Sequence, residues 1–171
     1  KQKLGLICAL IHTPEVLFLD EPTTGVDPLS RRDFWIILYE LLKGGVTILF
    51  STSYLDEAER CNRIGLIYGG ELLIVDTPSS VKARIEGTVM ELRLEDHQKG
   101  IKMLTGIESF RSLVLSGDKI HVLVDDSEKG ERIIREVLSE RGMEILGLTA
   151  VRPSLEDAFV SIVQERKKNK I

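Results

Sequence analysis

The stretch that decides the fold is VLFLDEP, residues 16–22, in which four apolar residues run directly into two carboxylates and a proline. A short apolar run of this kind is typical of a buried strand. Open α/β sheets bind ligands at the edge where the carboxyl ends of their strands lie, which is where Asp20 and Glu21 fall. In phosphoryl transfer, one such carboxylate helps to hold Mg²⁺ beside the phosphates, and its neighbour can orient the attacking water. We expect Asp20 in the first role and Glu21 in the second, although buried strands also run into acidic turns that have no such function.

The segment PTTGVDP, residues 22–28, follows directly. A structural explanation already accounts for it, because Gly25 permits a turn and Asp27 with Pro28 begins a helix. Another expected buried strand, at residues 46–50, runs into Ser51, Thr52 and Ser53 and again places small hydroxyl groups at the ligand edge.

The residues after this second strand also have a structural explanation. Ser53 can cap the next helix, and the acidic residues within 56–59 then decorate the first helical turn, where the helix dipole favours negative charge.

At least up to Val75, apolar strands alternate with amphipathic helices, which predicts an α/β core covered on both faces. The expected elements are a helix at about 4–12, a strand at 16–19, a helix from Pro28 to the Gly44-Gly45 pair, a strand at 46–50, a short helix at 53–60, a hairpin of 63–68 and 71–75 turning at Gly69-Gly70, and a helix opening at Thr77-Pro78.

From about Thr88 the pattern changes to that of a strand with one wet face, because Met90, Leu92 and Leu94 alternate with charged residues. The remaining elements complete the order β-α-β-β-α-β, which matches a ferredoxin-like unit. Ser154 and Asp157, spaced as in a capping box, begin a final helix. We place a boundary near Gly87, giving domains at 1–87 and 88–171.

The composition excludes several classes of protein. Of 171 residues, 43% are hydrophobic and 29% are charged, and the formal charge is −4. These values exclude a disordered tail, a collagen-like repeat and a disulfide-dense scaffold, and they argue against a strongly basic nucleic-acid binder. The longest apolar runs are far shorter than the roughly 20 residues that span a bilayer, so we expect any membrane contact to be peripheral. The two cysteines have no CxxC spacing, which supports neither a zinc site nor a disulfide framework, and a reducing cytosol is the default compartment.

In their order and spacing, these segments resemble the C-terminal half of the ATPase subunit of ABC transporters, over residues 1 to about 80. The matching motifs are Walker B with its glutamate at 16–21, the D-loop at 24–27 and the switch strand at 50–52. The opening residues 1–4 resemble those that follow the family's glycine-rich signature, so we expect the chain to be part of a longer protein. The fold that this resemblance implies is α/β, the C-terminal part of a P-loop NTPase (RecA-like) sheet followed by a small α+β ferredoxin-like domain.

The resemblance also implies a function for the full-length protein, which would bind and hydrolyse ATP with Mg²⁺ to drive export through a membrane permease. Asp20 would help to hold Mg²⁺ through water, and Glu21 would act on the attacking water. Asp27, with Gly25 in the same D-loop, would contact the opposing ATPase subunit near the shared nucleotide. The implied partners are a second ATPase subunit and an integral membrane permease, with no nucleic acid, at the cytoplasmic face of the membrane. This chain by itself is expected to be inactive, because the family's phosphate-binding loop GxxxxGK[ST] is absent from it.

The sequence departs from the family at Ser53, where the pattern S-T-H normally places a histidine that contacts the γ-phosphate and the attacking water. A serine hydroxyl is shorter and cannot become cationic, so we expect water positioning and charge stabilisation to suffer. Two explanations stay open, a natural low-turnover or gating subunit and an engineered or accidental substitution. His12, His97 and His121 lie outside the motif and are expected to be surface or turn residues.

The later half is similar to the extension found in exporter ATPases that pair with ABC-2-type permeases, with PSLEDAF at 153–159 resembling its terminal helix motif. By resemblance this extension supports dimerisation or tunes the ATPase. The basic tail at 166–170 is expected to be a frayed, solvated end rather than a lipid contact. Two alternatives to an efficient ATPase subunit stay open, a weakly hydrolysing, nucleotide-gated module and a non-catalytic partner-binding fragment in which only 88–171 folds stably. The sequence does not identify the transported substrate.

Overall fold

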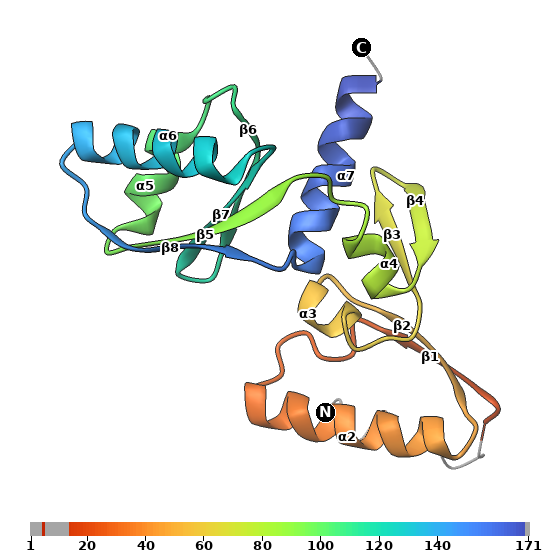
Figure 1. Cartoon of the computed structure of the whole chain (residues 1–171). Helices are drawn as coiled ribbons and strands as arrows, with labels where there is room; N and C mark the ends of the chain where they lie inside the picture. Colours follow the sequence, from red (N-terminus) through yellow and green to blue (C-terminus); the bar gives the residue numbers. More distant parts are fainter. Residues whose placement is uncertain (1–4, 6–13, 170–171) are drawn as a thin grey trace. The chain divides into compact units, whose positions relative to one another are not determined.

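The computed structural model describes residue 5 and residues 14–169 (Figure 1). Apart from residue 5, the helix expected at about 4–12 lies outside the described residues, and so does His12. The chain is mixed α/β with several small sheets, and it divides into two compact units between Glu57 and Ala58. Each unit is described by itself. The start of a separate domain after Gly87 remains a prediction.

The first unit is built on two parallel strands, β1 (Val16–Asp20) and β2 (Thr47–Ser51). Their register pairs Val16 with Thr47 at one end and Asp20 with Ser51 at the other. The long helix α2 (Pro28–Lys43) connects them, as parallel strands require, and the short helix α3 (Leu55–Ala58) follows β2.

Helix α2 begins and ends where the sequence indicates. The Asp27 side chain caps it by accepting a hydrogen bond from the backbone N–H of Ser30 at 2.9 Å, and Pro28 occupies the first turn. Gly44 caps the other end, and Gly45 follows with a φ of +89° that favours glycine.

The two parallel strands are covered on one face only among the described residues, so the expectation of a core covered on both faces is wrong here. Trp35 of α2 packs on Phe50 with ring centroids 5.1 Å apart, and Leu17 is buried. On the opposite face, Phe18 is 72% exposed and its register partner Leu49 is 62% exposed. Side chains alternate across a strand, and α2 packs against only one of the two faces.

The second unit opens with an antiparallel hairpin, β3 (Ile64–Tyr68) and β4 (Glu71–Asp76). Gly69 and Gly70, at φ +59° and +78°, form the turn, which confirms the expected hairpin. Helix α4 (Pro78–Lys82) follows, and the Thr77 side chain caps it.

The larger sheet contains β5 (Thr88–Leu94), β6 (Phe110–Ser116), β7 (Lys119–Val124) and β8 (Ile145–Val151). Helix α5 (His97–Leu104) connects β5 to β6, helix α6 (Ser127–Glu140) connects β7 to β8, and α7 (Leu155–Asn169) is the last element of the described residues. The strand order is β6-β7-β5-β8, and every neighbouring pair is antiparallel. The expected β-α-β-β-α-β order is therefore confirmed.

A hydrophobic core fills the space between this sheet and helices α5 and α6. Its fully buried members include Leu92 of β5, Ile120 of β7, and Ile134 and Leu138 of α6. The other face of the sheet is not the wet face that the alternation predicts. Contacts between α7 and β6, and from α7 to His121 of β7, partly cover it.

Two expectations about individual side chains are wrong. His121 is only 8% exposed in the middle of the sheet, where a surface or turn position was expected. The chain is also helical as far as Asn169, where a frayed end over 166–170 was expected, and residue 170 lies outside the described residues. Arg166 pairs with Glu71, and the Lys167 ammonium lies 5.7 Å from the centre of the Tyr68 ring. In the part of the chain that the structure describes, no helix has both the length and the apolar character needed to cross a membrane.

Candidate functional site

The two carboxylates that follow β1 lie beside the end of β2. The Asp20 carboxylate accepts a hydrogen bond from the Ser51 hydroxyl. The backbone N–H of Glu21 points to the same residue, 3.1 Å from the Ser51 carbonyl oxygen and 3.2 Å from its Oγ. The predicted arrangement, in which carboxylates and hydroxyls meet at the carboxyl ends of two parallel strands, is present in the structure.

Glu21 has an unusual backbone. Its φ is +44°, and among the described residues it is the one non-glycine residue with a positive φ. The left-handed conformation costs an L-residue about 1–2 kcal/mol, and such strain concentrates at functional sites. A hydrogen bond closes the bend, because the N–H of Thr24 donates to the Glu21 carbonyl at 3.2 Å, and the ring of Pro22 fixes its own φ directly after Glu21.

The Glu21 carboxylate accepts hydrogen bonds from its own segment, which follows β1, and from the segment that follows β2. Its Oε2 accepts from the Thr24 hydroxyl at 3.0 Å and from the Ser53 hydroxyl at 3.4 Å. The structure therefore brings Glu21 and Ser53 together, although 32 residues separate them in the sequence. Hydroxyl groups that donate to one carboxylate oxygen fix the rotation of that carboxylate at the sheet edge.

Gly25 and Asp27 lie on the turn that leads into α2. Gly25 has a φ of +72°, beside a turn closed by a hydrogen bond from the N–H of Val26 to the Thr23 carbonyl at 3.0 Å. The Asp27 carboxylate caps α2, and the bond from the backbone N–H of Ser30 lowers the pKa of that carboxylate below its usual value. The structural explanation of Asp27 is thereby confirmed, and its contact with an opposing subunit stays a prediction.

Sequence reasoning missed Glu57. It belongs to the acidic cluster that was expected to decorate the first turn of a helix, yet its side chain is fully buried. Its Oε2 accepts from the hydroxyls of Thr23 at 2.8 Å and Thr52 at 3.0 Å. On its other oxygen, Oε1, the Trp35 indole N–H donates at 3.4 Å and the Arg31 Nε lies 3.5 Å away. The signal available in the sequence is the spacing of Arg31 and Trp35, which places a cation and an indole donor on one face of α2.

The oxygen groups at the end of β1 and β2 suit a hard divalent cation. Asp20 offers a carboxylate and Ser51 a hydroxyl, and both are oxygen ligands of the kind that Mg²⁺ prefers. Within residues 14–169, no group of three or more His, Cys, Asp or Glu side chains could hold a metal by itself. One carboxylate is sufficient where substrate phosphates and water complete the coordination of Mg²⁺.

The second unit contains a buried ion pair. His121 Nδ1 lies 3.0 Å from both carboxylate oxygens of Asp157, and its Nε2 lies 3.7 Å from Glu91. Hydrogen bonding to Asp157 raises the pKa of His121 above its usual value. Burial alone would raise the pKa of Asp157, but the bonds from His121 and Ser154 outweigh it, and the net shift is downward.

Asp157 also forms the capping box expected at the start of α7. Its Oδ2 accepts from the Ser154 N–H at 2.8 Å, and its own N–H donates to the Ser154 hydroxyl at 3.1 Å. The capping box fixes the first turn of α7, and the ion pair between His121 and Asp157 attaches that turn to β7. His121 and Asp157 therefore have a structural role.

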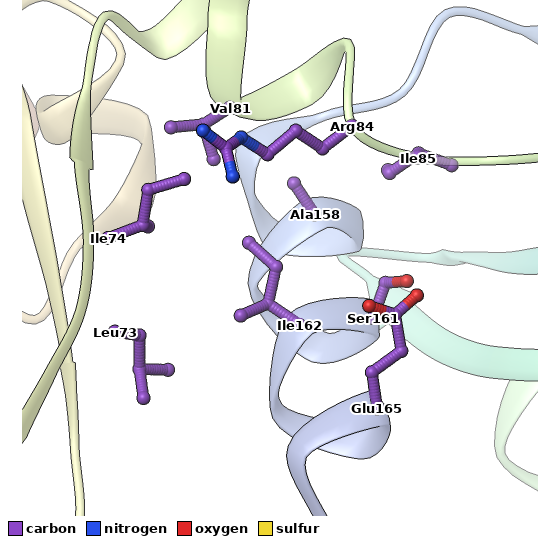
Figure 2. Close-up of a pocket in the computed structure, with 9 residues that line it drawn as sticks. All are labelled: Leu73, Ile74, Val81, Arg84, Ile85, Ala158, Ser161, Ile162 and Glu165. Carbon is purple, nitrogen blue, oxygen red and sulfur yellow. The ribbon is translucent and has the colours of Figure 1, made fainter. Parts of the chain in front are cut away.

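A small cavity lies between α4, β4 and α7 of the second unit (Figure 2). Leu73 and Ile74 of β4 face Val81 of α4 and Ile162 of α7 across it, with Arg84 at its edge. Six of its nine lining residues are aliphatic, and Arg84, Ser161 and Glu165 supply polar groups.

Comparisons with known proteins agree with the motifs. A model of the family described as "ATP-binding protein DrrA1-3-like, C-terminal domain" matches residues 77–163. The "Daunorubicin/doxorubicin resistance ATP-binding protein DrrA" of Streptomyces peucetius is 31% identical over 167 residues, which are 95% of this chain and 50% of that protein. The "Daunorubicin resistance ATP-binding protein DrrA3" of Streptomyces coeruleorubidus is 33% identical over 178 residues, 99% of this chain and 54% of that protein.

A shorter and stronger match is to the "Probable multidrug ABC transporter ATP-binding protein YbhF" of Escherichia coli, 52% identical over 84 residues, which are 49% of this chain and 14% of that protein. The chain spans about half the length of the two Streptomyces relatives. It belongs to the family of DrrA-like ABC transporter ATP-binding proteins and corresponds to their C-terminal portion, including the DrrA1-3-like C-terminal domain.

Proposed function

We propose that the chain is part of the ATP-binding subunit of an ABC exporter, which in full length hydrolyses ATP with Mg²⁺ to drive a substrate through a membrane permease. The observation that carries this proposal is the strained Glu21 at the end of β1, with the Ser53 hydroxyl 3.4 Å from its carboxylate. The relatives are named for resistance to daunorubicin and doxorubicin, which favours a drug-like organic molecule as the exported substrate.

In this proposal, residues 1–87 are the C-terminal part of a RecA-like P-loop NTPase domain. The parallel pairing of β1 with β2 through α2 supports this assignment. Residues 88–171 are a ferredoxin-like accessory domain with a final helix, supported by the antiparallel strand order β6-β7-β5-β8.

Each residue at the sheet edge has a role. Asp20, oriented by the Ser51 hydroxyl, would hold Mg²⁺ through water, and the metal would supply positive charge beside the phosphates. Glu21, held by Thr24 and Ser53, orients and polarises the attacking water. Gly25 and Asp27 meet the second ATPase subunit near the shared nucleotide.

The partners are a second ATPase subunit and an ABC-2-type permease, at the cytoplasmic face of the membrane and without nucleic acid. The 171 residues contain no GxxxxGK[ST] motif. By themselves they therefore lack the loop whose backbone N–H groups grip phosphates, and they neither bind nor hydrolyse ATP appreciably.

The test of this function is ATP binding and ATP hydrolysis by the full-length protein carrying Glu21→Gln. The glutamine keeps the shape of the side chain but is a far weaker base, so turnover falls at least about 100-fold while ATP affinity stays close to that of the wild type. Turnover at the wild-type rate in a folded Glu21→Gln protein would contradict the role of Glu21.

A second function, a nucleotide-gated module that hydrolyses ATP only slowly, is favoured by Ser53. In this case ATP binding closes a dimer and hydrolysis is incidental. Ser53→His in the full-length protein separates the two, because a histidine reaches further and can carry a positive charge. A gain in turnover of about tenfold or more supports the slow module. Unchanged turnover means that another residue already does the work of the histidine.

A further inference from the structure

Glu57 is a buried carboxylate between the two segments that carry the candidate catalytic residues. Removing such a group from water is unfavourable unless it is paired and hydrogen-bonded. Here Thr23, Thr52 and Trp35 donate to it, and the Arg31 guanidinium lies beside it. By contrast, the side chain of its neighbour Asp56 is 67% exposed. The fold therefore keeps Glu57 as a specific hydrogen-bond acceptor and not as one of several surface charges.

The two threonines that Glu57 joins belong to different segments. Thr23 follows β1 and lies two residues after Glu21, while Thr52 follows β2 and lies directly before Ser53. Both hydroxyls donate to the same oxygen, Oε2 of Glu57. One atom thus connects the segment that carries the water-orienting carboxylate to the segment that carries the switch residue.

This connection lies where the strand ladder ends. The register of β1 and β2 stops at the pair Asp20 and Ser51, and beyond it the backbone N–H of Glu21 still bonds to Ser51. The segment after β2 is fixed further by the Tyr54 N–H, which donates to Thr52 Oγ1 at 3.0 Å, and by the Arg31 guanidinium stacked 4.5 Å from the centre of the Tyr54 ring. Beyond the end of the strand pairing, the side-chain hydrogen bonds to Glu57 therefore help to hold these segments together.

We propose that Glu57 is a positioning residue of the ATPase site, which holds the segments after β1 and β2 together through Thr23 and Thr52 and so keeps Ser53 against the Glu21 carboxylate. This inference rests on the proposed function, because it assigns Glu57 to the reaction that Glu21 performs. Glu57 is buried behind these segments and acts through them rather than on the nucleotide. A displacement of reacting groups by about 1 Å can lower a rate about 100-fold, so a bridge of this kind affects turnover more than binding.

The first experiment removes the hydroxyls while keeping the shape of the side chains. Thr23→Val and Thr52→Val are made separately in the full-length protein, with Thr23→Ser and Thr52→Ser as variants that restore a hydroxyl. Thr47→Val is the matched control, since Thr47 is an exposed threonine at the opposite end of β2. For each variant, kcat and KM for ATP are measured beside the thermal unfolding midpoint.

The valine variants are expected to lose about 10–100-fold in kcat with KM changed by less than about threefold. The serine variants should recover most of kcat, and Thr47→Val should match the wild type. A merely structural role would lower the unfolding midpoint without this split between kcat and KM. Wild-type kcat in a folded Thr52→Val protein, or a serine variant as slow as its valine counterpart, overturns the proposal.

Glu57→Gln keeps the inference testable if a valine variant does not fold. The amide has a single acceptor oxygen, so it cannot accept from the threonine hydroxyls on one side and from Trp35 on the other. Because Trp35 is the single tryptophan of the chain, its fluorescence in the 171-residue chain reports directly on this site. A changed Trp35 emission with kcat lowered at least about tenfold in the full-length variant is expected, and wild-type kcat overturns the proposal.

Glu21→Gln, measured in the same series, separates the two claims. If Glu21→Gln leaves turnover intact, the proposed function fails, and the positioning role fails with it. If Glu21→Gln abolishes turnover while the threonine and Glu57 variants hydrolyse ATP at the wild-type rate, the positioning role alone is wrong.

Discussion

Replacing Asp157 with asparagine should loosen the attachment of α7 to β7 and destabilise the second unit. Asp157 is 2% exposed and pairs with His121, which is 8% exposed, so water screens the pair very little. The asparagine keeps the size of the side chain, and with its amide oxygen at the Oδ2 position it can still accept both bonds from Ser154. It cannot offer a carboxylate to the imidazole.

The size of the effect follows from this geometry. Breaking one partner of a buried ion pair costs about 3–5 kcal/mol, because the other charge is left without compensation. Since the amide retains the bonds from Ser154 at the start of α7 and His121 remains 3.7 Å from Glu91, we expect the lower end, about 3 kcal/mol near pH 6.

The pH dependence has a definite sign. The pKa of His121 is raised in the folded protein by its bond to Asp157, so its contribution to stability is complete below its ordinary pKa of about 6.5 and is lost as pH rises through the raised pKa. The pKa of Asp157 is lowered, so its contribution is present above about 3.9 and is lost as pH falls through the lowered pKa. The penalty of Asp157→Asn should therefore be larger near pH 6 than near pH 9.

The assay is urea unfolding of the chain at both pH values, followed by circular dichroism, since Trp35 lies in the other unit. Asp118→Asn is the matched control, because Asp118 is exposed in the turn between β6 and β7, where asparagine fits equally well. A loss below about 1 kcal/mol at pH 6, or a loss that does not shrink at the higher pH, would refute the reasoning.

Two further predictions concern the packing of the second unit. Gly130→Ala in α6 should destabilise the chain in urea unfolding, because the new Cβ would lie 2.7 Å from Cγ1 of the stiff, buried Val124. In an open helix the same change stabilises by about 1 kcal/mol. A more stable variant would contradict the prediction. Leu138→Ala, at a fully buried position of α6, should cost about 2–5 kcal/mol in the same assay. Leu146→Ala, on a side chain of β8 that is 62% exposed, should change stability by about 0.5 kcal/mol or less, and equal losses in the two leucine variants would count against the assigned core.

Local patterns in the sequence were sufficient for most of the elements. Asp27 with Pro28 and Thr77 with Pro78 begin helices because a side-chain cap and a fixed φ act within a few residues. The Gly69-Gly70 turn is equally local, because both positions need positive φ. The candidate site was found for a related reason, since parallel strands bring the residues after them to one edge.

Burial of polar groups could not be predicted in this way. Glu57 was assigned to a helix surface, and His121 to a surface or turn, because each is polar and its partners are distant in the sequence. Asp157 lies 36 residues from His121, and Thr23 lies 34 residues from Glu57. Polar side chains are buried when the tertiary fold supplies hydrogen-bond partners, and no pattern of neighbouring residues reports that.

The central claim is that the carboxylate after β1 performs ATP hydrolysis, and the most direct test compares the two glutamates that flank this strand. Glu21→Gln and Glu15→Gln are each made in the full-length protein, and ATP turnover is measured with ATP affinity. Glu15 is exposed and lies before β1, at the end opposite Glu21. We expect turnover to fall at least about 100-fold in Glu21→Gln and to stay at the wild-type rate in Glu15→Gln, with ATP still bound by both. Equal turnover in the two variants would contradict the account.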